Sequence, residues 1–174
     1  MMFNLSHRLI SMADRAAALD LFKFLEPLTN RYKSVTLSTA GFVIKAGGGV
    51  LVKTGAAVTH YIANGVKGRI AAATDMPALT GYVVANATFN VFVFTVSSAG
   101  TTYVQMGTAG ATEAAMKFPL LDQKRAILGM IIVNPAGTGD FTGNSTALDD
   151  VTVFSSGGVT YVSPVGMFDP GTIV

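Results

Sequence analysis

The sequence predicts a mainly β fold: an antiparallel β-sandwich or jelly-roll-like domain with an N-terminal α-helical arm. Three observations lead to this fold class. From residue 34 onward, about ten short stretches rich in β-branched and aromatic residues follow one another, divided by Gly, Asn and Ser. No helical period lies between these stretches, which excludes a parallel sheet built from βαβ units. Before residue 33, apolar residues recur instead at helical spacing.

The length sets the number of domains. A chain of 174 residues is long enough to bury one core and is close to the usual size of a single domain. We therefore expect a helical arm of residues 1–33 and a β-sandwich domain of residues 34–174. The arm lacks the order of basic, apolar and small-residue regions that marks a signal peptide, so we expect a protein that is not secreted.

The arm is expected to form an amphipathic helix. Its apolar residues step by four, three, four and three positions, which places them on one helical face. These residues are Leu5, Leu9, Met12, Ala16 and Leu19. Ser11 to Asp14 have the pattern of a capping box, which would begin the helix at residue 12 rather than residue 5. Pro27 ends the helix.

The end of the arm, LFKFLEPL (21–28), is apolar nearly all round. Such a segment must be buried, either against the β domain or against a neighbouring subunit. The stripe in front of it is also compatible with a small dimeric or trimeric coiled coil, although two heptads are marginal in isolation.

The β domain is expected to consist of short strands joined by tight turns. Gly and Asn between the strands can adopt the positive φ that hairpin turns require, notably at 46–49, 64–65, 97–100 and 157–158. The expected strands are SVTLS (34–38), GFVIKA (41–46), GVLVKTG (49–55), VTHYIA (58–63), VKGRIAA (66–72), GYVVAN (81–86), TFNVFVFTVSS (88–98), TTYVQMG (101–107), AILGMIIV (126–133), VTVFSS (151–156) and VTYVS (159–163).

Two of these strands, at 90–96 and 126–133, are apolar on both faces. A strand at the surface of a two-layer sandwich should alternate apolar and polar residues, so we expect both faces of these strands to be covered. The N-terminal helix or another subunit is the expected cover. An obligate oligomer, most simply a closed ring, would hide the surface that a monomer would expose.

Charge is scarce and unevenly distributed. Charged residues make up 13% of the chain and apolar residues 50%, which leaves little charge to cover a monomer's surface. Residues 1–69 hold nine basic and three acidic side chains, whereas residues 70–174 hold three basic and seven acidic ones. Either the two halves lie side by side and neutralise one another, or the basic part docks on an acidic partner surface. The basic residues are scattered singly, so we expect no nucleic-acid partner.

The sequence offers no constellation that carries chemistry. Cysteine is absent, and His7 and His60 are too few for a zinc site or a catalytic dyad. No serine lies in a nucleophile-elbow motif. GTGDFTG (137–143) lacks phosphate-loop spacing and a following helix, so we expect a plain loop there. Asp140, Asp149 and Asp150 lack the alternating pattern of calcium loops. We therefore predict no catalytic residue, no metal, no cofactor and no enzymatic activity.

Membrane insertion is not expected either. The longest clean apolar run, from Ala126 to Val133, is bounded by Arg125 and Asn134. It is far shorter than the roughly 20 residues that a helix needs to cross a bilayer.

A family resemblance adds a function to this description. GTGDFTGNSTALDDVTVFSS, which follows a strand, resembles the closing region of structural proteins of tailed bacteriophages, in particular capsid decoration (cement) proteins and related head-fibre or tail-fibre modules. GGGVLVKTGAAVTHYIANGVKGRIAA and GYVVANATFNVFVFTVSSAGTTYVQMG resemble the small Gly-, Ala- and Thr-rich β modules of the same particles. The likeness covers residues 35 to 155 and includes a loose G-x-x-I-V, F-T-G and T-x-L-D pattern.

The resemblance implies a β-sandwich or jelly-roll trimer that sits at three-fold or quasi-three-fold positions of a capsid and clamps neighbouring shell proteins. Its partners would be the major capsid protein and other copies of itself, in a virion assembled in the host cytoplasm. The helical arm would reach neighbours, although it is longer and more apolar than a simple docking tail. The expected oligomer or capsid interface consists of Leu5, Leu9, Met12, Leu19, Phe22, Phe24, Leu25, Phe92 and Phe94.

Two other functions stay open. A phage fibre or receptor-binding module would present aromatic clusters at a tip, but the chain has no Trp and five Tyr. A small carbohydrate-binding or enzyme accessory β domain would need a pocket with convergent polar groups. Binding to capsids, sugars or cells separates the three functions.

Overall fold

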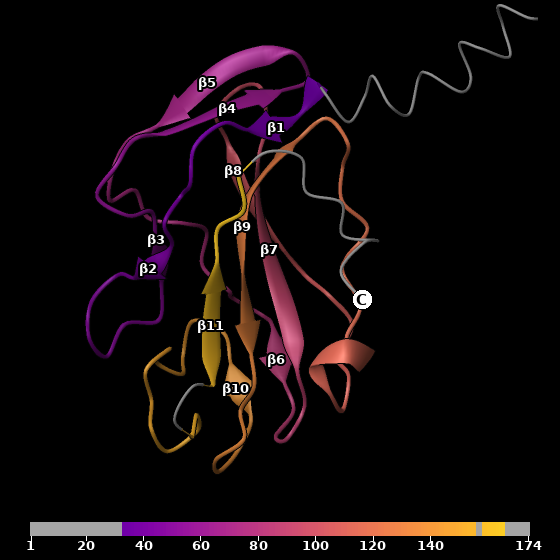
Figure 1. The fold of residues 1–174 in the computed structure, drawn as a ribbon. Helices are drawn as coiled ribbons and strands as arrows, with labels where there is room; N and C mark the ends of the chain where they lie inside the picture. Colours follow the sequence, from indigo (N-terminus) through magenta and orange to yellow (C-terminus); the bar gives the residue numbers. More distant parts are fainter. Residues whose placement is uncertain (1–32, 156–157, 166–174) are drawn as a thin grey trace, which may run out of the picture.

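The computed structural model describes residues 33–155 and 158–165 (Figure 1). The predicted helical arm, apart from Lys33, lies outside the described residues. The described part is mainly β, and all its strand pairs are antiparallel, as predicted. In chain order it contains β1 (Val35–Thr36), β2 (Val43–Ile44), β3 (Val52–Lys53), β4 (Thr59–Ala63), β5 (Val66–Ile70), β6 (Val83–Val84), β7 (Asn90–Val96), β8 (Thr102–Met106), the 3₁₀ helix η1 (Glu113–Ala115), β9 (Ala126–Val133), β10 (Phe141–Thr142) and β11 (Val159–Val162).

The largest sheet has four strands in the order β11-β9-β7-β8 and runs along the length of the molecule (Figure 1). A three-stranded sheet, β1-β4-β5, crosses one end of it. The two-stranded ribbon β10-β6 lies at the other end, and the ribbon β2-β3 flanks the long sheet. The Thr36 hydroxyl of β1 donates a hydrogen bond to the Ile127 carbonyl of β9, which ties the two larger sheets together.

A β-bulge explains the unbroken apolar run of β9. Phe94 of β7 pairs with Gly129, but the next residue, Thr95, pairs with Ile127, so Leu128 is an extra residue in β9. The bulge shifts the phase of the strand by one position. Leu128 and Ile131 therefore face the same core, although their spacing of three would place them on opposite faces of a regular strand.

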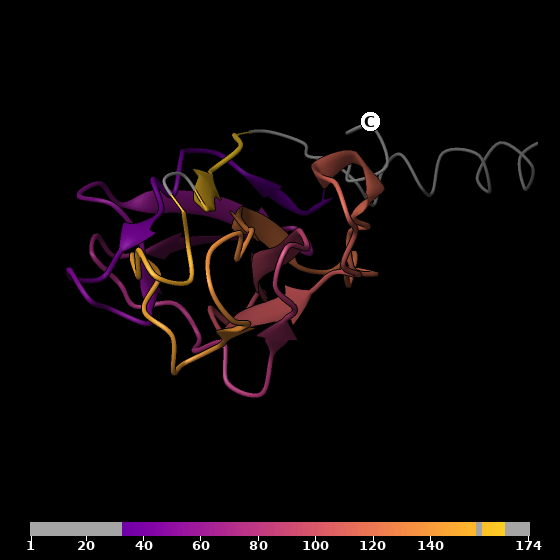
Figure 2. The same cartoon turned by 90° about the horizontal axis from the view of Figure 1, so that it is seen from below.

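The main core lies on one face of β7 and β9. A row of aromatic rings crosses it at centroid distances of 5.5 Å (Tyr82–Phe92), 6.0 Å (Phe92–Phe141) and 5.6 Å (Phe141–Phe154). These rings come from four separate parts of the chain. The core thus joins the long sheet to the ribbon β10-β6 and to the connection between β10 and β11. Figure 2, viewed from below, shows this connection and the ribbon beside the long sheet.

The second face of β7 is covered by the chain itself. Val91, Val93 and Met130 form a small core there, and half-buried Met116, Phe118 and Leu121 pack against it. The last three belong to the connection between β8 and β9, which contains η1 and is drawn in orange-red beside β7 in Figure 1. The expectation that both faces are covered is confirmed for β7, whereas Ile127 and Ile132 of β9 are only half-buried, and the source of the cover differs. The side chains of β7 need neither the N-terminal helix nor another subunit.

The predicted hairpin turn at Asn64-Gly65 is confirmed. Both residues have positive φ, 50° and 79°, and they are the two residues between the paired ends of β4 and β5. This is the geometry for which Asn-Gly is favoured. Gly100, in the predicted turn between β7 and β8, also has positive φ.

Two local predictions are wrong. The stretch 151–156 was expected to be a strand, but as far as it is described it forms a turn that closes with a hydrogen bond from the Phe154 amide to the Asp150 carbonyl. GTGDFTG was expected to be a plain loop, yet Phe141 is fully buried and belongs to β10, which pairs with β6. A strand of two residues is too short to show an alternation of apolar and polar residues. The apolar side chain of Phe141 was therefore the one feature of the sequence that could have indicated burial.

Candidate interaction surfaces

The structure changes the predicted interface. Phe92 and Phe94 were expected at an oligomer or capsid interface, but both side chains are fully buried in the chain's own core. The prediction is wrong for these two, because the even positions of β7 face the main core rather than the outside. The other seven predicted interface residues, Leu5, Leu9, Met12, Leu19, Phe22, Phe24 and Leu25, lie outside the described residues.

The titratable groups singled out in the sequence have local structural roles. Asp149 accepts hydrogen bonds from the Gly48 amide at 2.8 and 3.1 Å. Asp140 accepts one from the Asn86 amide, and Asp150 one from the Thr152 amide, both at 2.8 Å. Within the described ranges, no three His, Cys, Asp or Glu side chains come close enough to hold a metal ion.

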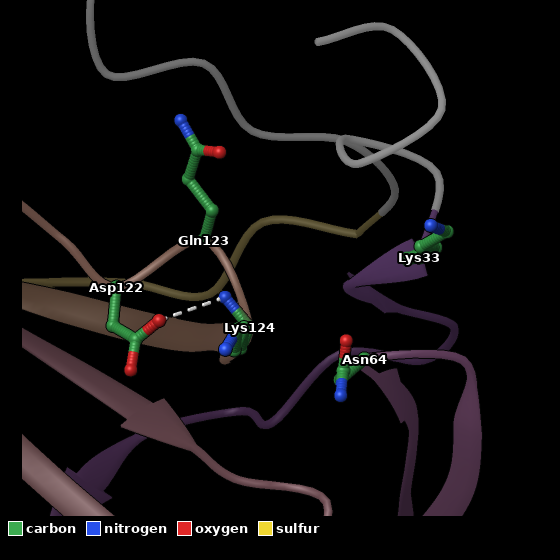
Figure 3. A pocket seen from close by; sticks show the side chains of 5 residues that line it. All are labelled: Lys33, Asn64, Asp122, Gln123 and Lys124. Atoms are coloured by element: carbon green, nitrogen blue, oxygen red, sulfur yellow. Dashed lines mark hydrogen bonds between the residues drawn. The ribbon is translucent and has the colours of Figure 1, made fainter. Parts of the chain in front are cut away.

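A polar cleft of about 340 Å³ opens where the described chain begins. Figure 3 shows its lining side chains, which come from the first described residue, the β4–β5 turn and the approach to β9: Lys33, Asn64, Asp122, Gln123 and Lys124. Asp122 accepts a hydrogen bond from the Lys124 amide at 2.9 Å and pairs with Arg125 at 3.3 Å. Asp122 is therefore engaged by its own neighbours in the chain.

Two tyrosines have shifted pKa values. Burial raises the pKa of Tyr61, whose side chain lies over Gly68 of β5. Burial also raises the pKa of Tyr161, and the negative charge of Asp149 adds to this rise. Both groups are neutral near neutral pH, and neither lies in the polar cleft.

Some large apolar side chains remain on the outside. Leu120 is 94% exposed and Val151 87% exposed, far more than the other exposed aliphatic residues. Leu120 follows the segment that covers the second face of β7, and Val151 follows two carboxylates. When a partner covers such an aliphatic side chain, apolar surface is removed from water, which lowers the free energy of the complex.

The outer face of the β1-β4-β5 sheet is both basic and apolar. The strand register places Val35, Ile62 and Lys67 in one row and His60 and Arg69 in the next, where the Leu37 amide donates a hydrogen bond to the His60 carbonyl at 2.8 Å. Thr59, Tyr61 and Ala63 point into the core, so the alternating residues of β4 point outward. We call this surface the basic sheet face: Val35, Leu37, Val58, His60, Ile62, Lys67 and Arg69.

A projecting turn at the far end of the molecule is acidic. We call residues 149–153 the acidic turn, because it carries Asp149 and Asp150 next to the exposed Val151. The buried side chains of Leu148 and Phe154 anchor its two ends. Figure 1 shows the β1-β4-β5 sheet at one end of the molecule and the connection between β10 and β11, which contains the acidic turn, toward the other.

This arrangement bears on the two interpretations of the uneven charge. Two ion pairs join described residues: Lys45–Asp75 at 2.6 Å and Asp122–Arg125 at 3.3 Å. The first joins the basic half to the acidic half, and the second lies within the acidic half. Lys67 and Arg69 make no ion pair with the described acidic residues. In the described part, the Lys45–Asp75 pair therefore ties the basic half to the acidic half, whereas Lys67 and Arg69 do not contribute to their neutralisation.

Sequence reasoning missed the cover segment and the basic sheet face. Met116, Phe118 and Leu121 have no strand or helix period, so only their apolar character marked them. The basic sheet face had a clearer signal, because VKGRI places Lys67 and Arg69 two residues apart and hence on one side of a strand.

No helix in the described ranges is both long and apolar enough to cross a membrane. Compared with family models, with curated proteins and with solved structures, the chain matches none of them.

Proposed function

We propose that the chain is a virion structural protein that binds the outside of an icosahedral phage capsid and stabilises the shell as a decoration, or cement, protein. The sequence resemblance over residues 35–155 suggests the particle. The structural observation that carries the proposal is the exposure of Leu120 (94%) and Val151 (87%), two aliphatic side chains that a partner protein would cover. Burial of these side chains against a shell protein would remove their apolar area from water and favour binding.

The proposed role is mechanical. A protein that binds only the assembled shell lowers the free energy of that state and not that of the dissociated subunits. By mass action, a free concentration of a hundred times the dissociation constant adds about 2.7 kcal/mol at each site. Because a capsid repeats the same site many times, a modest interface is sufficient to reinforce it.

We propose further details with this role. The antiparallel β domain is a jelly-roll-like sandwich that assembles as a trimer, and the apolar residues of the arm contact neighbouring subunits or the shell. These details extend the sequence resemblance, and the mass of the full chain in solution tests the trimer. A stable monomer at all accessible concentrations would contradict it.

The function is tested with virions that lack this chain. Purified protein added to such particles should sediment with them, saturate at a fixed ratio to the major capsid protein, and raise the temperature at which DNA is released. Deletion of residues 2–33 should abolish attachment if the arm makes the contact, and circular dichroism should show that the remaining β domain is folded.

Two results would contradict the proposal. The first is a lack of binding to capsids together with binding to cells or to isolated glycans, which would favour a receptor-binding or carbohydrate-binding module. The second is binding without any change in DNA release, which would leave the protein attached to the shell but without a cementing role.

A further inference from the structure

We infer that copies of this chain associate head to tail, with the acidic turn of one copy bound on the basic sheet face of the next. Capsid binding is not required for this contact, which is a property of the protein alone. The inference rests on the chemistry of two surfaces that lie apart in one copy and so cannot satisfy each other within it (Figure 1).

The basic sheet face lacks any compensating acid. No Asp or Glu occurs from Lys33 to Thr74, a stretch that includes all three strands of the sheet. Lys67 and Arg69 are exposed on β5, which is an edge strand of its sheet. On the same face of the sheet, Leu37 is 46% exposed and Val58 40% exposed. The face therefore fits a partner surface with carboxylates around a small apolar side chain.

The acidic turn has this chemistry. Its exposed apolar side chain is Val151, directly preceded by Asp149 and Asp150. The turn is also held in shape before any partner arrives, because the Phe154 amide donates to the Asp150 carbonyl at 2.8 Å and the Thr152 amide to the Asp150 carboxylate at 2.8 Å. A preformed turn loses little conformational entropy on binding.

Lys67 and Arg69 could also have a role that involves no second copy of the chain. Lys and Arg on an edge strand also discourage edge-to-edge pairing with other sheets. That role needs positive charge on β5 alone and assigns nothing to Val151. A second copy is the occupant favoured here because the complementary surface is on the same chain. A contact between two different surfaces is heterologous, so it builds a closed ring or an open filament.

The test is a charge exchange in the full-length protein, followed by sedimentation velocity over a range of concentrations. Val151→Lys places a cation on the acidic turn, and Lys67→Glu places an anion on the basic sheet face. Each variant alone should weaken self-association by about tenfold or more, because Val151→Lys adds repulsion from Lys67 and Arg69, and Lys67→Glu adds repulsion from Asp149 and Asp150. An equimolar mixture of the two should associate again, since the unaltered acidic turn of the Lys67→Glu variant then meets the unaltered basic sheet face of the Val151→Lys variant.

Matched variants control for net charge. Lys117→Glu changes the charge as Lys67→Glu does, and Ala111→Lys changes it as Val151→Lys does, but both positions are exposed and lie outside the two surfaces. These controls should associate like the unaltered chain. Association of the unaltered chain should also weaken when salt rises from about 0.05 M to about 0.5 M, because exposed charges are then screened. Val151 and Lys67 are exposed, so neither substitution disturbs the core.

Three outcomes would overturn the inference. One is a chain that is monomeric at every concentration. Another is association that neither substitution weakens, which would place the contact on another surface and leave β5 with its edge-protecting role. The third is weakening without recovery in the mixture. Capsid attachment is measured separately, so failure here leaves the cement role standing, and loss of capsid attachment leaves this contact standing.

Discussion

Gly129 shows how one missing side chain shapes the core. A Cβ built at this position would lie 2.7 Å from the Phe42 ring and 2.7 Å from the Val162 carbonyl oxygen. Phe42 also packs edge-on against Phe94, at a centroid distance of 5.1 Å. The bulge of β9 therefore brings a glycine under an aromatic ring and leaves no room for a larger residue.

We predict that Gly129→Ala lowers the free energy of unfolding by about 1–3 kcal/mol, because the backbone of β11 and the Phe42 ring must both move. Urea unfolding measures this. Gly47→Ala is the matched control: its Cβ would meet only an Asp149 oxygen at 3.9 Å, so its stability should stay close to that of the unaltered chain. Equal stabilities for the two variants would contradict the packing described for Gly129.

Thr95 carries a polar group that the core does not satisfy. Its side chain is fully buried on β7, and its hydroxyl has no hydrogen-bond partner. We predict that Thr95→Val raises the free energy of unfolding by about 1 kcal/mol, since it replaces an unpaired hydroxyl with a methyl group of similar size. Thermal unfolding measures the change, and Thr101→Val, at an exposed position, should have little effect. A less stable Thr95→Val variant would indicate that the hydroxyl is bonded after all.

At the scale of elements, the connection between β8 and β9 acts as a cover for the long sheet. Met116 packs against the small core of Val91, Val93 and Met130, whereas Leu120, four residues later, points into water. The two side chains have similar volume and differ in burial. They therefore form a natural comparison for the role of this segment.

We predict that Met116→Ser lowers the free energy of unfolding by about 1–2 kcal/mol, whereas Leu120→Ser changes it by less than about 0.5 kcal/mol. Chemical denaturation of both variants measures the difference. If Leu120→Ser were as destabilising as Met116→Ser, Leu120 would have to be buried in the protein in solution, most simply in an oligomer.

Local pattern predicted the strands better than their partners. Asn64-Gly65 set the β4–β5 hairpin, because its turn needs only those two residues. The partner of β6 was not predictable, because β10 is two residues long and lies more than fifty residues away along the chain. The same reason explains Phe92: its apolar character was read correctly, but periodicity does not tell an inner face from an outer one when both faces are apolar.

At the scale of the whole molecule, the shifted tyrosines set an alkaline limit to stability. The pKa values of Tyr61 and Tyr161 are raised above the ordinary value of 10.0. The folded protein therefore keeps these protons when the unfolded chain has begun to lose them. This contribution is fully present below pH 10 and is lost as the pH rises through the folded-state pKa values.

We predict that the free energy of unfolding falls above about pH 10 and that Tyr61→Phe makes this fall shallower, because one of the two shifted groups is then absent. Unfolding curves at a series of pH values measure both effects. The same variant at neutral pH provides the control, since both forms of residue 61 are uncharged there. An unchanged alkaline slope would contradict the assignment to Tyr61.

The separation of charge is the property of the whole molecule with the widest consequence. The sequence shows that basic residues precede acidic ones, but only the fold shows that the β1-β4-β5 sheet and the acidic turn lie toward opposite ends (Figure 1). Because its basic and acidic surfaces are separated, the chain can pair either surface with an oppositely charged surface of a partner protein or of another copy. The head-to-tail contact depends on this separation.

The sequence by itself determined the mainly β character, the positions of most strands, the Asn64-Gly65 turn and the absence of thiol chemistry, since each depends on residues that are neighbours in the chain. Only the tertiary structure decided that Met116, Phe118 and Leu121 cover the second face of β7, that Phe141 enters the core, and that Phe92 and Phe94 are internal. These features depend on contacts between segments distant in sequence, and the energy of such contacts comes from the area they bury together rather than from any local period.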